Sequence, residues 1–153
     1  MIKTTAPGKV VLWGEYAVLA GAAAGVMALN TPATVAASRS PDDEWHFSSQ
    51  GFGAEPASCA ADELPKKTAT ALLAAVLRHW GFGSLDQCGQ AMRVHTDSSA
   101  FFQNSQKLGL GSSAAVCAAT YRLLCELTAR KPTLTEAMAI HQDWQGGKGS
   151  GLD

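Results

Sequence analysis

One long helical run limits the folds that are open to this chain. From Ser112 to Arg130, apolar residues recur at the spacing of an α-helix, and Pro132 ends the run because proline cannot continue a helix. The residues that share its apolar face are Val116, Ala119, Leu123, Leu124 and Leu127. A helix with one apolar face must bury that face against another layer. The rest of the chain therefore has to supply the layer.

The first third of the chain has the pattern of β-strands. In the segment "EWHFS", Trp45 and Phe47 alternate with polar neighbours, which is typical of a half-buried strand. A second alternation, around Met92 and Val94, indicates another strand later in the chain. Strands are predicted at residues 2–6, 9–13, 26–29, 33–38, 44–48 and about 90–97.

A loop and a second helix lie between these strands. Residues 49–64 are rich in Gly, Ala, Ser and Pro, so we expect an exposed loop there. Pro65 then precedes a stripe of apolar residues from Leu72 to Trp80, and Gly81 is a natural C-terminal stop for this helix.

A last helix is predicted near the end of the chain. Thr133 and Glu136 have the spacing of a capping box, and the helical pattern continues to about Gln145. The residues on one face of this helix are Ala137, Ile140, His141 and Trp144. A β-rich start followed by helix, strand, helix and helix predicts a mixed α+β fold in layers.

Composition excludes several classes of protein. The 153 residues are 46% hydrophobic and 16% charged, which suits one domain with a core, and the formal net charge of −1 offers no basic field for nucleic acid or anionic lipid. No segment approaches the roughly 18 continuous apolar residues of a membrane span, and no signal-peptide pattern follows Met1. The four cysteines lack metal-site spacing, so we expect buried free thiols. These features predict a cytoplasmic protein with neither nucleic acid nor membrane as a partner.

The segment "KLGLGSSAAV", from Lys107 to Val116, opens the long helix and raises two hypotheses. Gly109 and Gly111 allow the backbone to approach an anion closely, the serines offer hydroxyls, and the helix directs its free N–H groups and positive dipole end at the loop. The alternative is a glycine-rich turn with a serine cap and no ligand. The segment matches neither a Walker A loop, nor G-x-G-x-x-G, nor the G-x-S-x-G elbow.

Two other segments have unusual composition. Near the start, "APGKVVLWGEY" contains a Pro7-Gly8 turn that presents Lys9 at the beginning of a strand. At the end, "QGGKGSGLD" is a glycine-rich stretch that closes with Asp153. Taken alone, Lys9 suits a solvated surface lysine and the last stretch suits a frayed terminus.

Taken together, the three segments resemble the GHMP small-molecule kinases, named for galactokinase, homoserine kinase, mevalonate kinase and phosphomevalonate kinase. "APGKVVLWGEYAVLAG" is similar to the family's N-terminal motif, "GLGSSAA" to its central ATP loop, and "GSGLD" to the segment that carries its catalytic aspartate. The resemblance runs from Ala6 to Asp153 and implies a two-layer β/α domain of the ribosomal-protein-like type over residues 1–153. It also implies ATP and Mg²⁺ as cofactors.

The resemblance implies a role for particular residues. Asp153 would orient or deprotonate the substrate hydroxyl, and Lys9 would stabilise the charge that develops there. The ATP phosphates would be held by Lys107, Gly109, Leu110, Gly111, Ser112, Ser113 and Ala114. Residues near the substrate would be Lys9, Glu15, Lys148 and Ser150.

The Mg²⁺ site implied by the resemblance is only half specified. Ser113 matches one ligand of the ion. In mevalonate kinases an acidic ligand lies on the helix before the catalytic aspartate; its equivalent here is near Gln142, and Asp143 is the neighbouring carboxylate. Adjacent helix positions point about 100° apart, so Asp143 departs from the family pattern.

The substrate remains open between members of the family. "QGGKGSGLD" is closer to the phosphomevalonate kinase form than to "HGxPSGxD" of mevalonate kinases, and Lys148 suits a phosphate already present on the substrate. Mevalonate kinase or another GHMP kinase is the alternative. Family members usually carry a second, C-terminal domain, which this chain does not contain. We expect the chain to be an N-terminal fragment of a longer kinase and to be inactive alone; the alternative is a truncated lobe that at most binds nucleotide. The apolar face that a second domain would cover also predicts association, for example as a homo-oligomer.

Overall fold

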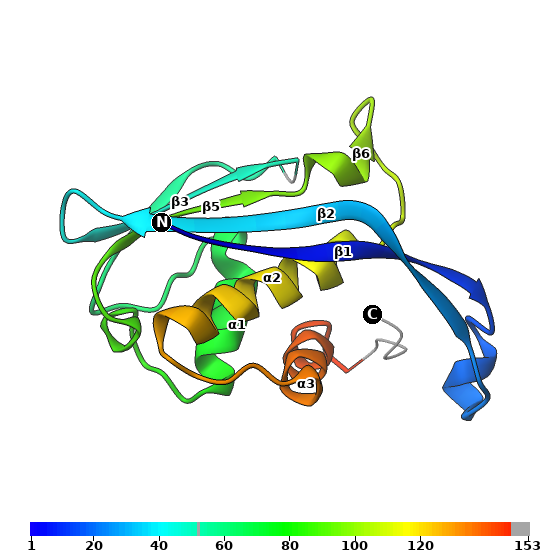
Figure 1. The fold of residues 1–153 in the computed structure, drawn as a ribbon. Coiled ribbons are helices and arrows are strands. Elements are labelled where there is room, and N and C mark those ends of the chain that lie inside the picture. Colours follow the sequence, from blue (N-terminus) through cyan, green and yellow to red (C-terminus); the bar gives the residue numbers. More distant parts are fainter. Residues whose placement is uncertain (52, 148–153) are drawn as a thin grey trace.

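Two long antiparallel strands, β1 (Ile2–Trp13) and β2 (Gly25–Arg39), form one side of the fold (Figure 1). The computed structural model describes residues 1–51 and 53–147. The other strands are β3 (Glu44–Gln50), β4 (Ala57–Ala60), β5 (Met92–Asp97), β6 (Phe102–Gln103) and β7 (Gln106–Lys107). The α-helices are α1 (Ala71–His79), α2 (Ser112–Leu127) and α3 (Leu134–Trp144). Short 3₁₀ turns are η1 (Ala17–Ala20), η2 (Thr68–Thr70), η3 (Asp86–Cys88) and η4 (Ser99–Phe101).

Five strands make one sheet in the order β1-β2-β5-β3-β4. The pairs are antiparallel except for β3 and β5, which run parallel and are connected through β4 and α1. The alternation predicted around Trp45 and Met92 is confirmed, because Trp45, Phe47, Met92 and Val94 all point into the core.

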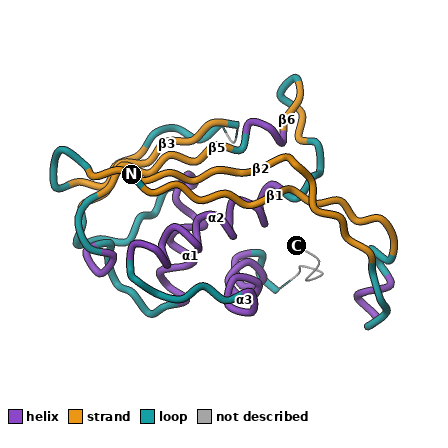
Figure 2. The backbone as a smooth tube through the Cα atoms, in the orientation of Figure 1, coloured by secondary structure: helices purple, strands orange, loops and turns teal. Residues whose placement is uncertain are grey.

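The α-helices lie together on one face of this sheet (Figure 2). Helix α2 contacts β1 and β2, and its buried residues include Ala119, Leu123 and Leu124. A buried hydroxyl also joins the layers, since Thr4 Oγ1 donates to the Ala119 carbonyl at 2.7 Å. The long helix is therefore covered by the sheet, and the α+β two-layer fold is confirmed.

The β1–β2 hairpin is longer than predicted. The four short strands expected at 2–6, 9–13, 26–29 and 33–38 are two continuous strands, with the register shifted between Pro7 and Gly8. The far end of the hairpin extends past the helices (Figure 1). Large apolar side chains on this arm are exposed: Leu12, Trp13, Tyr16, Leu19, Val26 and Met27.

Two predicted boundaries were wrong, and one was confirmed. The loop expected at 49–64 contains strand β4, whose backbone pairs with β3 despite its small side chains. Helix α1, which begins at Ala71 after a 3₁₀ turn, confirms the stripe predicted from Leu72 to Trp80. Helix α2 ends at Leu127 rather than at Arg130, because Ala129 takes a left-handed conformation with φ 53°.

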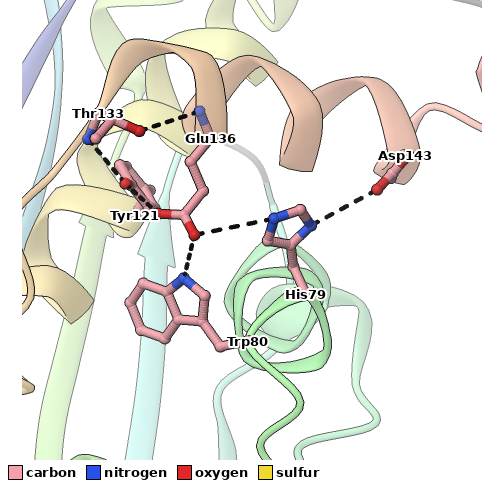
Figure 3. A network of polar contacts seen from close by, with 6 residues as sticks. All are labelled: His79, Trp80, Tyr121, Thr133, Glu136 and Asp143. Atoms are coloured by element: carbon pink, nitrogen blue, oxygen red, sulfur yellow. Dashed lines mark hydrogen bonds and ion pairs between the residues drawn. The ribbon is translucent and has the colours of Figure 1, made fainter.

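A network of polar contacts fixes α3 against the other helices (Figure 3). The predicted capping box is confirmed on one side, because Thr133 Oγ1 accepts from the Glu136 N–H at 3.3 Å. The Tyr121 hydroxyl donates to Glu136 Oε2 at 2.5 Å and accepts from the Thr133 N–H at 3.0 Å. Trp80 Nε1 donates to the other oxygen of Glu136 at 3.2 Å. One carboxylate thus ties α1, α2 and α3 together.

Free thiols are confirmed at all four cysteines, of which Cys88, Cys117 and Cys125 are buried and Cys59 is half-buried. Within the described residues, no helix has the length and apolar character that crossing a membrane requires.

Candidate phosphate-binding site

The loop between β7 and α2 lies at the end of a tight hairpin. Strands β6 and β7 are joined by Asn104 and Ser105, both with positive φ (49° and 64°), a conformation that suits a two-residue hairpin turn. Beyond the hairpin, the Leu108 N–H donates to the Phe101 carbonyl at 2.9 Å. The hairpin therefore sets the position from which the loop enters α2.

Gly109 and Gly111 both adopt the left-handed conformation that favours glycine, with φ of 73° and 74°. A β-carbon on Gly109 would meet no atom of residues 1–51 or 53–147 within 4 Å, so the described part of the chain leaves open space beside this residue. Gly111 is different, because a β-carbon there would lie 2.9 Å from Cγ of Lys9. The first glycine leaves room for a ligand, and the second lets the lysine side chain pass.

Within the part of the chain that the structure describes, no side chain caps the start of helix α2. Gly111 is the N-cap residue and offers no side chain, while Ser112 already lies inside the helix. The serine cap that the alternative hypothesis expected is therefore wrong for this helix, whereas the choice between a loop with a ligand and a turn without one stays a prediction. Backbone N–H groups and the positive end of the helix dipole face the loop without a capping oxygen, an arrangement that favours an anion.

The backbone of Lys9 is hydrogen-bonded to the loop. Its N–H donates to the Leu110 carbonyl at 2.9 Å, where the register of β1 shifts. The preceding Gly8 is needed for this approach, because a β-carbon there would lie 2.9 Å from the Leu110 oxygen and 2.8 Å from Phe101. The lysine side chain then runs past Gly111. Two motifs about a hundred residues apart in the sequence thus meet in one place.

His141 is a residue of this site that the sequence did not single out as functional. Its Nε2 lies 3.3 Å from Oγ of Ser113, its side chain is buried, and its ring stacks on Trp144 with centroids 5.9 Å apart. Sequence reasoning placed His141 on the apolar face of the last helix. The signal that could have found it is a polar residue on that face.

A cavity of about 140 Å³ adjoins the loop. Its walls come from the start of α1, the start of α2 and strands β3 and β5, with Lys107, Ser112 and Ser113 on one side. Its polar lining is largely hydroxyl groups: Ser48, Ser49, Thr68, Thr70, Thr96, Ser98 and Thr120. Its apolar lining includes Leu72, Val116 and Trp144. A wider hollow of about 570 Å³ lies on the outer face of the sheet, and none of the predicted site residues that the structure describes lines it.

Other predicted residues lie elsewhere or outside the described chain. Glu15 is exposed in the turn after β1, on the projecting arm. The Asp143 carboxylate is 77% exposed and lies 3.7 Å from Nδ1 of His79 on α1 (Figure 3). Lys148, Ser150 and Asp153 fall outside the described residues, so their roles stay predictions.

The loop fits a phosphate group and, with it, one magnesium ion. The open side of Gly109 and the uncapped start of α2 form a cradle for phosphate oxygens. A metal site made of protein ligands alone would need a cluster of three or more His, Cys, Asp or Glu side chains. No such cluster occurs among residues 1–51 and 53–147. Mg²⁺ in nucleotide sites typically needs only one or two protein ligands beside phosphates and waters. The residues present fit this pattern if the hydroxyl of Ser113, which lines the adjoining cavity, supplies one ligand.

The comparison of family profiles agrees with this geometry. The profile described as "GHMP kinases N terminal domain" matches residues 64–153, which is more than half of the chain and includes the loop, α2 and α3. The chain belongs to the GHMP kinase family, as the three motifs predicted. Among curated proteins, none matches it in sequence.

Solved structures share the fold. Streptococcus pneumoniae phosphomevalonate kinase, in complex with phosphomevalonate and AMPPNP, superposes with a TM-score of 0.73 at 18% identity, over 99% of this chain and 44% of that one. Methanococcus jannaschii mevalonate kinase gives 0.77 at 18%, over 99% and 49%. Lactococcus lactis galactokinase, complexed with galactose, gives 0.72 at 18%, over 99% and 38%. This chain therefore spans less than half the length of each, and identities this low establish the fold alone.

Proposed function

We propose that this chain binds ATP with Mg²⁺ at the loop from Lys107 to Ala114, as the nucleotide lobe of a small-molecule kinase. The observation that carries the proposal is the start of α2, which no side chain of the described residues caps, with space that those residues leave open beside Gly109 and the Lys9 side chain against Gly111. Phosphoryl transfer depends mainly on positioning and on neutralising phosphate charge, and a helix N-terminus with a nearby lysine provides both.

Each part of the site has a task in this proposal. The N–H groups of Ser112, Ser113 and Ala114 would bind phosphate oxygens, and Ser113 Oγ would be the serine ligand of the magnesium ion. The cavity beside the loop, with its hydroxyl and apolar lining, would hold the rest of the nucleotide. Magnesium, when bound, would neutralise charge on the β- and γ-phosphates. Asp143 remains the proposed acidic ligand; its contact with His79 means that its side chain would have to turn toward the loop.

The transfer itself would involve the two ends of the chain. The γ-phosphoryl group would pass from ATP to a substrate hydroxyl, with ADP as the leaving group and the hydroxyl proton passing to Asp153. The Lys9 cation would stabilise negative charge on the hydroxyl oxygen. Glu15, Lys148 and Ser150 would lie near the substrate.

Phosphomevalonate is the proposed substrate. The form of the segment from Gln145 to Asp153 supports it, as does the likeness to a phosphomevalonate kinase solved with phosphomevalonate and AMPPNP. Mevalonate, or the substrate of another GHMP kinase, is the alternative, since mevalonate kinase and galactokinase structures share the fold. The chain spans under half of these enzymes, so we also propose that catalysis needs a second lobe and that the chain alone binds nucleotide without turnover. Cytoplasmic location and self-association stay predictions.

Calorimetry on the 153-residue chain tests the nucleotide site. We expect ATP with Mg²⁺ to bind, and Ser113→Ala to weaken that binding while Ser58→Ala, on the exposed edge strand β4, leaves it unchanged. Binding that survives Ser113→Ala in full would remove this serine from the metal site. A chain that binds no nucleotide would overturn the proposal.

An ADP-release assay tests the substrate. A polypeptide that carries this chain together with a second lobe should turn over with mevalonate 5-phosphate and much less with mevalonate, and Asp153→Asn should lower kcat severely with little change in ATP affinity. The opposite substrate preference would overturn the phosphomevalonate assignment. Robust turnover by the 153-residue chain would show that a second lobe is not required.

A further inference from the structure

His141 is a titratable side chain that is buried in the core. Within residues 1–51 and 53–147, it is the only His, Lys, Arg, Asp or Glu side chain in the buried class, with 6% of its surface exposed. Burying an imidazole is unfavourable unless its nitrogens find partners. One of those nitrogens, Nε2, faces the hydroxyl of Ser113, in the first turn of the helix that the loop opens.

The helix that carries His141 is held firmly. Thr133 caps its first turn, and the Glu136 carboxylate receives hydrogen bonds from Tyr121 on α2 and Trp80 on α1. The ring itself stacks on Trp144, with 21° between the two planes. The rigid helix and the stacked ring fix the position of Nε2. A fixed acceptor of this kind is needed to orient the Ser113 hydroxyl, which would otherwise rotate freely.

We infer that His141 orients the Ser113 hydroxyl by accepting its proton in a hydrogen bond to Nε2, so that the oxygen lone pairs face the loop. A serine hydroxyl has one proton and two lone pairs. If the proton points at the imidazole, both lone pairs remain for a cation in the loop; if it points into the loop, it opposes that cation. His141 is therefore a positioning residue for the metal-bound nucleotide and acts through Ser113.

This inference rests on the proposed function. It predicts effects on ATP binding that differ from those of a histidine that only packs in the core. A histidine that only fills space should affect ATP binding equally with and without Mg²⁺. A histidine that orients the Ser113 oxygen should affect only the binding that involves the metal, and only while the Ser113 hydroxyl is present. Because both would act through the Ser113 oxygen, the effects of His141→Leu and Ser113→Ala on ATP binding should not be additive.

Calorimetry with ATP, in Mg²⁺ and in EDTA, on the 153-residue chain distinguishes these cases. We expect His141→Leu to weaken binding roughly three- to tenfold in Mg²⁺, the range of one hydrogen bond, and to leave binding in EDTA unchanged. His141→Gln, whose amide oxygen can accept from Ser113, should recover most of the loss. His141→Leu should have no further effect in Ser113→Ala. The control is His46→Leu, on the outer face of the sheet, which should change neither measurement.

Nitrogen-15 NMR of the unsubstituted chain gives a second measurement that does not depend on a variant folding. We expect the neutral tautomer of His141 with Nδ1 protonated and Nε2 bare. A protonated Nε2, equal losses in Mg²⁺ and EDTA, or additive effects of His141→Leu and Ser113→Ala would each overturn the inference while leaving nucleotide binding intact. If the unsubstituted chain binds ATP in neither condition, the proposed function itself fails and takes the inference with it.

Discussion

Gly111 and Lys9 occupy adjoining space that only a glycine leaves free. A β-carbon at position 111 would lie 2.9 Å from Cγ and 3.0 Å from Cε of Lys9, so the whole lysine side chain would have to move. The Lys9 backbone cannot move with it, since its N–H is bonded to the Leu110 carbonyl. The glycine therefore fixes both the helix start and the direction of the lysine.

Comparing Gly111→Ala with Gly109→Ala separates these two effects. Both residues have positive φ, so alanine at either position should cost about 1–2 kcal/mol of unfolding free energy from backbone strain. Gly111→Ala should cost more, because it also displaces Lys9, whereas a β-carbon on Gly109 meets none of the described residues. Urea denaturation measures the difference. Equal losses in the two variants would mean that Lys9 is not held against Gly111.

Tyr121→Phe tests the network that holds α3. The substitution removes the donor to Glu136 and the acceptor for the Thr133 N–H, so we expect a loss of about 1–2 kcal/mol in unfolding free energy. Tyr16→Phe is the matched control: Tyr16 is 81% exposed on the arm, and the same change there should be nearly neutral. A neutral Tyr121→Phe would show that Glu136 is held well enough by Trp80 alone.

Alkaline titration of Tyr121 gives a test with a defined pH range. Burial, followed by the hydrogen bond to Glu136, raises the pKa of Tyr121 from 10.0 to about 12. Because the pKa is raised in the folded state, the stability that Tyr121 contributes is fully present below pH 10.0 and is lost as pH rises toward about 12. Tyrosinate absorbance should show a step near pH 12 that Tyr121→Phe removes. If the step near pH 12 is absent from the unsubstituted chain, the Tyr121 hydroxyl is solvated.

Much of this fold follows from local pattern. The alternation around Trp45 and Met92, the stripe of α1 and the Thr133 capping box each report a short-range physical requirement, and each is confirmed. Strand β4 was missed because its residues, Ala57–Ala60, carry no apolar alternation and are placed by backbone pairing with β3. Residue propensity reflects the preference of each side chain. An edge strand that is held by backbone pairing with the neighbouring strand is therefore hard to recognise from propensity.

The candidate site, like the fold, could be predicted from the sequence only in part. The glycine loop was predictable because positive φ and an exposed helix start need particular residue types. The contact of Lys9 with Gly111, and that of His141 with Ser113, depend on how β1 and α3 pack around α2, and spacing along the chain does not encode such packing. The position of the Asp143 side chain toward His79 is likewise a matter of which face of α3 meets α1.

Thiol reactivity tests the packing of the helices and sheet independently of any ligand. Burial raises the pKa of Cys88 to about 11 and that of Cys117 to about 12, and only the thiolate reacts. Cys125 is buried as well, whereas Cys59 is half-buried on the edge strand β4. With a disulfide reagent at pH 8, we expect one thiol to react while the chain is folded and all four to react in denaturant. Cys59→Ser should remove the early thiol; if early reaction persists in that variant, the layer between sheet and helices opens more readily than its packing indicates.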